Sequence, residues 1–376
     1  MAVLSGLDRP FLWVCLGVER GGTMGSQKEL PFDEPQNEDL WGLDCEFIMM
    51  ENPEGWQSSQ KSEEQKLEVQ RRARALTAGQ RCGYAQKIDF TVRCVRKAIK
   101  AIPIDQWCLS WSAGNDSTAL SLVLRHICKL KIPHVMSNTR LEYPETIRNM
   151  HSYRRVLEAD GVPVFVAYPD KRPADVWKED GIPLFSKELA SKYRQWLKTG
   201  NDAHLKQVPE YLHAPFHRLR EAGVVLTEKC CDELKKKPML KVRKQHGFTG
   251  SFTGVRASES MSRRLGFIQR GALYNSTRNR QWICNPIVHW SEEDVQKTLA
   301  RFGVVLERPG NGSGRSGCVN CGFGCHIASQ RGEENSLQLL HRNNITMWNR
   351  TMKEWGFEEA CVVAGIPVVS KEKEML

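Results

Sequence analysis

A polar loop that follows an apolar strand and precedes a helix is the feature that most constrains how this chain can fold. Residues 104–111 form a short, largely apolar run of the kind found in a parallel sheet covered on both faces. Beyond Gly114, apolar residues at helical spacing favour a helix that runs to the break at Pro133. The order strand, loop, helix is the repeating unit of an α/β fold.

Strand-like and helix-like segments continue to alternate around this unit. Residues 133–137 and 162–168 are predicted strands, and residues 144–159 between them are a predicted helix. Residues 86–102 predict a helix before the first strand, and residues 248–255 predict a further strand. The alternation predicts a right-handed parallel sheet flanked by helices.

Composition excludes several classes of protein. Hydrophobic residues make up 40% of the chain and charged residues 26%, values typical of a globular protein rather than a disordered one. No apolar run approaches the roughly 20 residues that span a bilayer, and we expect no signal peptide. The net charge of +10 favours anionic partners such as nucleotides, sulfate or nucleic acid. The 13 cysteines, an odd number, indicate reduced thiols and metal ligands, so we expect a cytoplasmic protein.

The loop after the first predicted strand carries side chains suited to phosphate. Unpaired backbone N–H groups at a helix start attract anions, and Gly114 permits close approach of the backbone. The hydroxyl groups of Ser112, Ser117 and Thr118 can donate to phosphate oxygens, and Asp116 can hold Mg²⁺ against them. The same residue types also begin ordinary helices as N-caps, so the residues alone leave both interpretations open.

Three segments together resemble the superfamily of ATP pyrophosphatases and adenosine-phosphosulfate reductases. Residues 112–117 read S-A-G-N-D-S and are similar to its pyrophosphate loop, S-G-G-x-D-S, with Ala113 in place of the first glycine. Residues 138–146 read N-T-R-L-E-Y-P-E-T and resemble its N-T-G-L-E-Y-P-E-T segment, with Arg140 in place of the glycine. Residues 253–263 resemble its T-G-x-R-x-x-E-S-x-x-R segment.

The resemblance extends over about residues 106–326 and implies an adenine nucleotide alpha hydrolase-like fold of the PP-loop type, named after the pyrophosphate loop. It implies that ATP and Mg²⁺ bind at the ends of the strands, with Asp116 and Ser117 acting in catalysis. The nucleotide-binding residues that it implies are Ser112, Gly114, Asp116, Ser117, Thr118, Glu142, Gly254 and Arg256. The substrate-binding residues that it implies are Arg256, Glu259, Ser260 and Arg263.

Some of these residues also have ordinary interpretations. Arg256 is a bidentate donor suited to phosphate or sulfate, or a surface arginine paired with Glu259. Glu142 and Glu145 can contact a metal or adenosine, or can place negative charge in the first turn of the next helix.

Two pairs of cysteines lie far apart in the sequence. Cys230 and Cys231 are adjacent, whereas Cys318 and Cys321 form a C-x-x-C segment among glycines. Four thiolates can hold zinc or a four-iron cluster, and diverging vicinal side chains suit separate iron corners better than one zinc ion. The pattern resembles that of the iron-sulfur adenylylsulfate reductases, which implies a 4Fe-4S cluster on these four cysteines. Cys325 stays open as an alternative ligand, and zinc as an alternative metal.

We therefore expect three regions. Residues 1–60 form a polar N-terminal extension. Residues 61–300 form a PP-loop nucleotide-binding α/β domain with a helical insertion around residues 171–247. Residues 301–376 form a cysteine-rich, helical C-terminal region that completes the iron-sulfur site.

The first functional hypothesis is an enzyme that adenylates its substrate with ATP, releases pyrophosphate and lets a sulfur donor displace the adenylate. Such an enzyme is similar to DNA phosphorothioation sulfurtransferases and to tRNA thiolation enzymes, so DNA or RNA is an expected sulfur acceptor. The alternative is a phosphoadenosine or adenosine phosphosulfate reductase that makes sulfite with a thioredoxin-like donor. Reductases of that type carry a sulfur-attacking cysteine in an E-C-G-L-H segment. The nearest candidate here is Cys361, whose E-A-C-V-V segment lacks the glycine and histidine.

A third hypothesis is a non-catalytic nucleic-acid-binding protein with a retained nucleotide site. Basic residues cluster within residues 235–244, and further arginines stand at positions 263, 264, 270, 278 and 280. These side chains can follow a phosphate backbone, or can form an ordinary solvated face.

Overall fold

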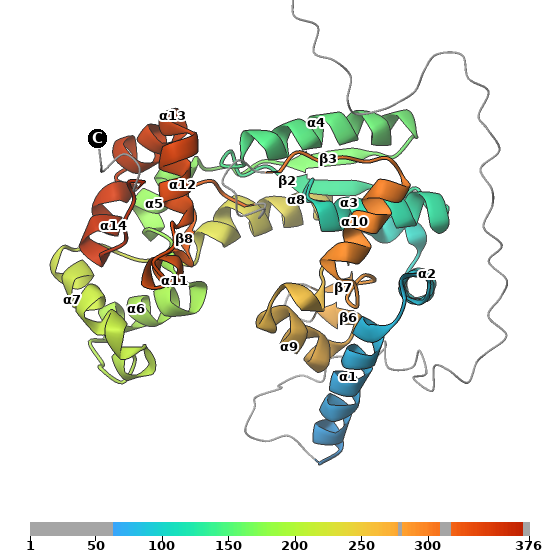
Figure 1. Cartoon of the computed structure of the whole chain (residues 1–376), viewed down its shortest axis with the longest axis horizontal. Helices are drawn as coiled ribbons and strands as arrows, with labels where there is room; N and C mark the ends of the chain where they lie inside the picture. The colour runs from blue at the N-terminus through green and yellow to red at the C-terminus, as the bar shows by residue number, and fades with distance from the viewer. Residues whose placement is uncertain (1–62, 277–279, 309–316, 371–376) are drawn as a thin grey trace, which may run out of the picture.

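A computed structural model describes residues 63–276, 280–308 and 317–370. They form two lobes, one built around a sheet and the other from helices (Figure 1). The expected polar extension of residues 1–60 lies outside the described residues. No helix among the described residues has the length and apolar character to cross a membrane.

The first lobe is built around a six-stranded sheet in the order β3-β2-β1-β5-β7-β6. Five strands run parallel, and β6 at the edge runs antiparallel to β7. The parallel α/β architecture expected from the sequence is therefore confirmed. The strands are β1 (Trp107–Ser110), β2 (His134–Ser137), β3 (Val164–Ala167), β5 (Gly250–Thr253), β6 (Leu273–Ser276) and β7 (Gln281–Cys284).

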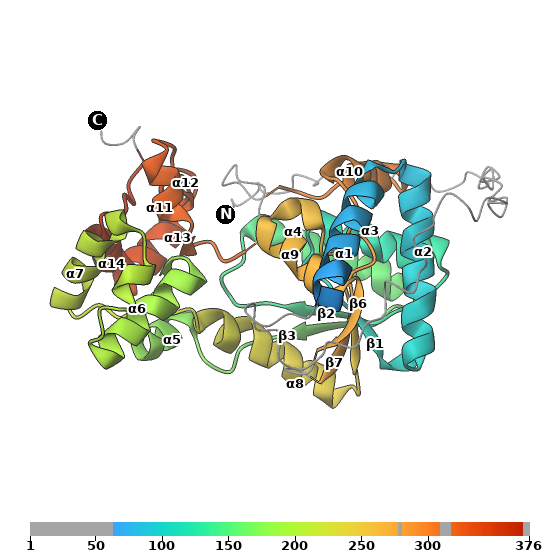
Figure 2. The ribbon, with the colours of Figure 1, turned by 90° about the horizontal axis from the view of Figure 1, so that it is seen from below.

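Helices cover both faces of this sheet. The larger core lies on the face that carries α3 and α10, while α8 packs against β2 and β3 on the other face (Figure 2). The helices of this lobe are α1 (Glu63–Arg81), α2 (Tyr84–Ala101), α3 (Asn115–Leu122), α4 (Pro144–Ala159), α8 (Lys237–Gln245), α9 (Met261–Arg270) and α10 (Glu292–Arg301). Short 3-10 turns precede β1 (Ile104–Gln106) and α9 (Ala257–Glu259).

The helix after the anion loop is shorter than its apolar pattern predicts. α3 ends at Leu122, and the chain continues as one π-helical turn over Val123–Ile127 that the N–H of Cys128 closes onto the carbonyl of Val123. The wider turn keeps apolar residues on the buried side while it ends the α-helical hydrogen bonding.

The second lobe combines two stretches of chain that are distant in sequence. Side chains from residues 176–234 and 319–368, together with Leu141 and Tyr143, share one hydrophobic core that includes the buried rings of Trp196, Phe216 and Trp348. Its helices are α5 (Pro173–Asp180), α6 (Lys187–Thr199), α7 (His213–Glu221), α11 (Cys325–Gln330), α12 (Ser336–Asn343), α13 (Ile345–Trp348) and α14 (Phe357–Ala364). Shorter 3-10 and π turns complete it at Leu205–Gln207, Glu210–Leu212, Asp232–Lys236 and Asn349–Glu354.

A two-stranded parallel sheet joins these two stretches. β4 (Leu184–Phe185) pairs with β8 (Gly322–Phe323), which places the glycine-rich cysteine segment against the middle of the chain. The expected insertion extended to residue 247, but α8 belongs to the sheet lobe. Met239 explains this placement, because it packs with Val135 and Ala167 on the face of the sheet opposite the larger core.

Candidate functional site

The anion loop is held in shape by its own serines. The backbone N–H of Ser112 donates to Ser117 Oγ at 3.1 Å, and the two hydroxyl oxygens lie 3.1 Å apart. Ser117 Oγ in turn donates to the carbonyl of Gly114 at 3.2 Å. Gly114 is the N-cap of α3 and has no side chain to cap it, so the serines stabilise the loop rather than the helix end.

Two residues that replace family glycines adopt backbone angles that favour glycine. Ala113 has φ of +56° and Arg140 has φ of +67°. A positive φ is energetically unfavourable for residues with a Cβ atom. Both loops therefore hold a backbone conformation that glycine would adopt at lower cost.

Thr118 does not reach the open side of this loop. Its side chain is fully buried, and its hydroxyl accepts a hydrogen bond from Trp111 Nε1 at 3.0 Å. Thr118 is one of the five loop residues proposed from the sequence as phosphate ligands. In the structure its side chain instead holds Trp111 in place.

The loop after β5 lies directly against the anion loop, because β5 and β1 are neighbours in the sheet. A Cβ atom on Gly254 would lie 2.8 Å from the Cα and N atoms of Ser117. A Cβ atom essentially never comes that close to another heavy atom, so only glycine permits this approach of the two backbones.

Arg256 joins the two loops by an ion pair. Its Nε lies 2.8 Å from Asp116 Oδ1, and its Nη2 lies 2.6 Å from Glu292 Oε2 in the first turn of α10. Its Nη1 also donates to Ser258 Oγ at 3.3 Å, and the guanidinium is buried. Glu292 was not among the expected site residues. Residues 291–294 read S-E-E-D, which is typical of an ordinary helix-capping sequence.

The three other residues of this segment interact mainly with one another. Glu259 accepts a hydrogen bond from the backbone N–H of Arg256 at 3.2 Å and pairs with Arg263 Nε at 2.9 Å. Ser260 Oγ caps α9 by accepting from the N–H of Arg263 at 3.3 Å. Glu259 therefore pairs with Arg263, and the side chain of Arg256 stays with Asp116.

Burial shifts the pKa of Asp116. Loss of solvent raises the pKa of its carboxyl to about 6, with Arg256 opposing the shift and the carboxylates of Glu259 and Glu292 adding to it. The group therefore titrates just below neutral pH.

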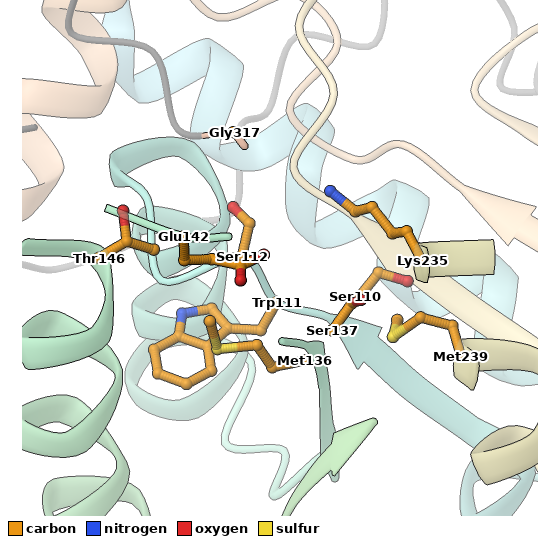
Figure 3. A pocket seen from close by; sticks show the side chains of 10 residues that line it. All are labelled: Ser110, Trp111, Ser112, Met136, Ser137, Glu142, Thr146, Lys235, Met239 and Gly317. Atoms are coloured by element: carbon orange, nitrogen blue, oxygen red, sulfur yellow. The ribbon is translucent and has the colours of Figure 1, made fainter. Parts of the chain in front are cut away.

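A pocket opens beside the loop, at the carboxyl ends of β1 and β2 (Figure 3). Its cavity volume is about 170 Å³. Trp111, Met136 and Thr146 lie on one side, and Lys235 and Met239 lie on the other. The remaining lining residues are Ser110, Ser112, Ser137, Glu142 and Gly317. Ser112 and Glu142 are thus the residues of the expected nucleotide set that line the pocket.

Glu142 connects the pocket with the cysteine segment. Its carboxylate accepts hydrogen bonds from Thr139 Oγ1 at 2.9 and 3.0 Å, and the same hydroxyl lies 3.6 Å from Cys318 Sγ. Glu142 and Cys318 also form an antiparallel bridge, next to a 2.8 Å hydrogen bond from the N–H of Val319 to the carbonyl of Leu141.

The four cysteines expected to act together lie within electrostatic reach of one another. The pKa of Cys230 is raised by its hydrogen bond to Cys231, by burial and by the other two thiols. Burial and Glu142 raise the pKa of Cys318 to about 11. Burial and Cys318 raise that of Cys321 to about 12. Across the described part of the chain, no three His, Cys, Asp or Glu side chains are placed to hold one metal ion.

Two further cysteines are placed away from the pocket. Cys325 is buried, and its Sγ lies 3.3 Å from Ser336 Oγ and 3.7 Å from the carbonyl of Cys321. Cys361 is fully buried in α14, and burial raises its pKa well above the ordinary value. Neither thiol lines the pocket.

Most side chains of the basic run near α8 contact neighbouring groups of the protein. Lys236, Lys237 and Lys241 pair with the carboxylates of Asp232, Glu233 and Asp170. Arg243 turns inward and donates to Gln281 and Ser251. Lys235 instead lines the pocket, a position that the run of like charges did not reveal. Arg278, one of the expected basic residues, lies outside the described residues.

The parallel sheet, with a glycine-containing anion loop after its first strand, defines the class of PP-loop α/β proteins. Residues 106–308 match the phosphoadenosine phosphosulfate reductase domain, and the chain belongs to that family.

The solved structures that match this chain share little sequence with it. Phosphoadenylyl-sulfate reductase from Candida auris, in a phosphate complex, matches with 14% identity and a TM-score of 0.37, over 66% of this chain and 91% of that chain. FMN adenylyltransferase from Candida glabrata, in complex with ATP, matches with 10% identity and a TM-score of 0.34, over 62% of this chain and 63% of that chain. Among curated proteins, no sequence matches this one.

Proposed function

We propose that the protein is a nucleotide-dependent sulfur-transfer enzyme that adenylates its substrate with ATP and releases pyrophosphate. The observation that carries this proposal is the junction of the two loops, where Gly254 lies against Ser117 and Arg256 pairs with Asp116. A backbone approach that requires glycine, next to a buried guanidinium, suits the binding of a charged phosphate chain.

Each residue of the junction has a distinct role in this proposal. Ser112 and Ser117 orient the N–H groups at the start of α3 toward the phosphates, and Arg256 offsets the charge of the leaving pyrophosphate. Asp116 is the residue that would hold Mg²⁺, and its ion pair with Arg256 must open for both groups to contact the nucleotide. When bound, Mg²⁺ neutralises charge on the phosphate oxygens.

The pocket that Glu142 lines is the proposed place for the rest of the nucleotide and the substrate. Trp111 and Met136 offer apolar surface for a base, and Ser137 and Lys235 offer polar groups. Ser137 Oγ is buried and has no hydrogen-bond partner in the protein, so it is available to a ligand.

We propose that Cys230, Cys231, Cys318 and Cys321 hold a 4Fe-4S cluster, with Cys325 as an alternative ligand. The fit rests on the donor set, four thiols that influence one another electrostatically. The side chains of adjacent residues, such as Cys230 and Cys231, leave the backbone in diverging directions, which suits separate iron corners of a cluster better than one zinc ion. When bound, such a cluster would supply a site for electrons or sulfur near the pocket, because Cys318 forms a backbone bridge with the pocket residue Glu142.

The position of Cys361 favours adenylation over sulfonucleotide reduction. A reductase needs an exposed thiolate that attacks sulfur. Cys361 is fully buried in the helical lobe, and its pKa is raised, so it is poorly suited to that role.

Separate product assays test the proposal. The full chain is purified without oxygen, incubated with Mg²⁺ and ATP in the presence of DNA or RNA, and assayed for pyrophosphate. Asp116→Asn should abolish pyrophosphate release, whereas Glu293→Gln, next to Glu292 but outside the ion-pair network, should not. Sulfite formed from phosphoadenosine phosphosulfate, without pyrophosphate from ATP, would replace this proposal with the reductase. Nucleotide binding without either product would point to the non-catalytic alternative.

A further inference from the structure

One buried amide in the cysteine segment has no hydrogen-bond partner in the protein. Asn320 is 0% exposed, and neither its Oδ1 nor its Nδ2 has a partner. Buried side-chain amides are nearly always hydrogen-bonded, because burial without a partner forfeits the bonds that water would make. A polar group outside the protein chain is therefore expected next to Asn320.

The chain fixes where this amide lies. Asn320 stands between Cys318 and Cys321, whose backbones are joined by a 3.2 Å hydrogen bond from the N–H of Cys321 to the carbonyl of Cys318. The preceding residue is held on two sides, because the N–H of Val319 donates to Leu141 and its carbonyl accepts from Tyr143. Asn320 thus belongs to a constrained turn that carries two of the four thiols.

A second side chain of this segment shows the same property. His326 follows Cys325 directly, is 7% exposed, and its Nδ1 is buried without a partner. Single buried atoms without a partner also occur elsewhere in the helical lobe, at Trp177 Nε1, Arg194 Nε, Glu228 Oε2 and Glu334 Oε1. Among the described residues, Asn320 alone has both side-chain polar atoms buried without a partner, whereas the comparable amide of Asn335 accepts from the N–H groups of Leu337 and Gln338.

We propose that the side-chain amide of Asn320 donates a hydrogen bond to a sulfur atom of an iron-sulfur cluster bound by the neighbouring cysteines. The inference rests on the cluster in the proposed function. Sulfide and thiolate sulfur atoms accept hydrogen bonds from N–H groups. Such hydrogen bonds stabilise the reduced cluster more than the oxidised one, because the reduced cluster carries more negative charge. Asn320 is then a positioning residue for the cluster, and its hydrogen bond raises the reduction potential of the cluster.

Two variants separate this role from a role in folding. Asn320→Leu keeps the approximate size and removes all polar atoms, and Asn320→Asp keeps the shape and removes both N–H donors. Asn344→Leu is the control, because Asn344 Oδ1 accepts from the N–H of Met347 and caps α13 in the same lobe. All proteins are prepared anaerobically as full chains, and a cluster-free sample of each is made with a chelator.

In the loaded protein, both Asn320 variants should shift the reduction potential to more negative values and speed the loss of iron to a chelator. In the cluster-free protein, Asn320→Leu should leave the unfolding midpoint unchanged or raise it, because it removes an unsatisfied buried amide. Asn344→Leu should lower the midpoint of both forms and leave the potential unchanged.

The outcomes distinguish two failures. If the parent protein contains no iron after anaerobic purification and reconstitution, the cluster itself is wrong and this inference falls with it. If the parent holds a cluster but the Asn320 variants match its potential and its rate of iron loss, only this inference is overturned. A drop in the unfolding midpoint of both forms alike, as for Asn344→Leu, would also overturn it, because Asn320 would then bond to protein.

Discussion

Arg256 Nε lies 2.8 Å from Asp116 Oδ1, and this contact joins the loops that follow two neighbouring parallel strands. The contact lies where the strand order of the sheet reverses, with β2 on one side of β1 and β5 on the other. Open α/β sheets bind their ligands at such a point. Because each partner is also a candidate ligand for the nucleotide or its metal, nucleotide binding should compete with this ion pair.

Binding of Mg²⁺ and nucleotide should depend on pH through Asp116. Its pKa is raised to about 6, so the carboxyl is largely protonated at pH 5 and ionised at pH 8. Only the ionised form attracts Mg²⁺, so the affinity for Mg²⁺ with ATP should rise with pH across this range. Calorimetric titration at a series of pH values measures the midpoint.

Glu292→Gln should move that midpoint to lower pH. The carboxylate of Glu292 raises the pKa of Asp116, so its neutral substitute lets Asp116 ionise more easily. Glu293→Gln removes a charge from the same helical turn without touching Arg256, and should leave the midpoint unchanged. Equal shifts of the midpoint in the two variants would mean that the total negative charge at the start of α10, and not the contact of Glu292 with Arg256, raises the pKa of Asp116.

Gly254→Ala should damage both stability and nucleotide binding. The new Cβ would meet the backbone of Ser117 at 2.8 Å, and a backbone contact cannot be relieved by rotating a side chain. Overpacking of this kind costs about 1 to 3 kcal/mol. Displacement of the anion loop should further weaken ATP binding by about tenfold, equivalent to about 1.4 kcal/mol. Denaturant unfolding and nucleotide titration measure the two effects.

Gly317→Ala provides the matched control for that substitution. Gly317 lines the pocket, yet a Cβ there would meet nothing within 4 Å. The control should unfold and bind ATP as the parent does. Similar losses in both variants would contradict the view that the contact between Gly254 and Ser117 shapes the site.

Ala113→Gly and Arg140→Gly should not destabilise the protein, although glycine usually does. Both residues have positive φ, at +56° and +67°, where a Cβ atom costs about 1 to 2 kcal/mol. The flexibility of glycine offsets about 0.5 to 1 kcal/mol, so a net gain of up to about 1.5 kcal/mol is expected. Ala119→Gly in the buried face of α3 should instead lose about 1 kcal/mol. A comparable loss at Ala113 would show that the loop does not hold a left-handed residue.

The sequence predicted the elements whose pattern is local. The helix of residues 144–159 and the strands at residues 133–137 and 162–168 were confirmed to within a few residues, because apolar periodicity and proline breaks define them. β6 and β7 went unpredicted, since their four-residue segments carry polar side chains and no clear alternation.

Long-range assembly could not be predicted in the same way. The pairing of β4 with β8 brings together residues more than one hundred positions apart, and no local pattern encodes it. The same limit applies to the site. The family resemblance pointed to Asp116 and Arg256, but the further pairing of Arg256 with Glu292 depends on how α10 packs. Conversely, Thr118 has the residue type of a phosphate ligand and lies in the core.

Cys361→Ala tests which reaction the site performs. If the protein transfers sulfur through an adenylated substrate, this buried side chain serves packing alone, and turnover should stay within about threefold of the parent. The lost sulfur atom should lower the free energy of unfolding by about 1 kcal/mol, a cost typical of a small cavity. Ser117→Ala, in the anion loop, should instead abolish turnover, because it frees the N–H of Ser112 and disorders the phosphate site. Complete loss of activity in Cys361→Ala, with a normal unfolding curve, would identify Cys361 as a nucleophile that becomes exposed during the reaction, and would favour the reductase.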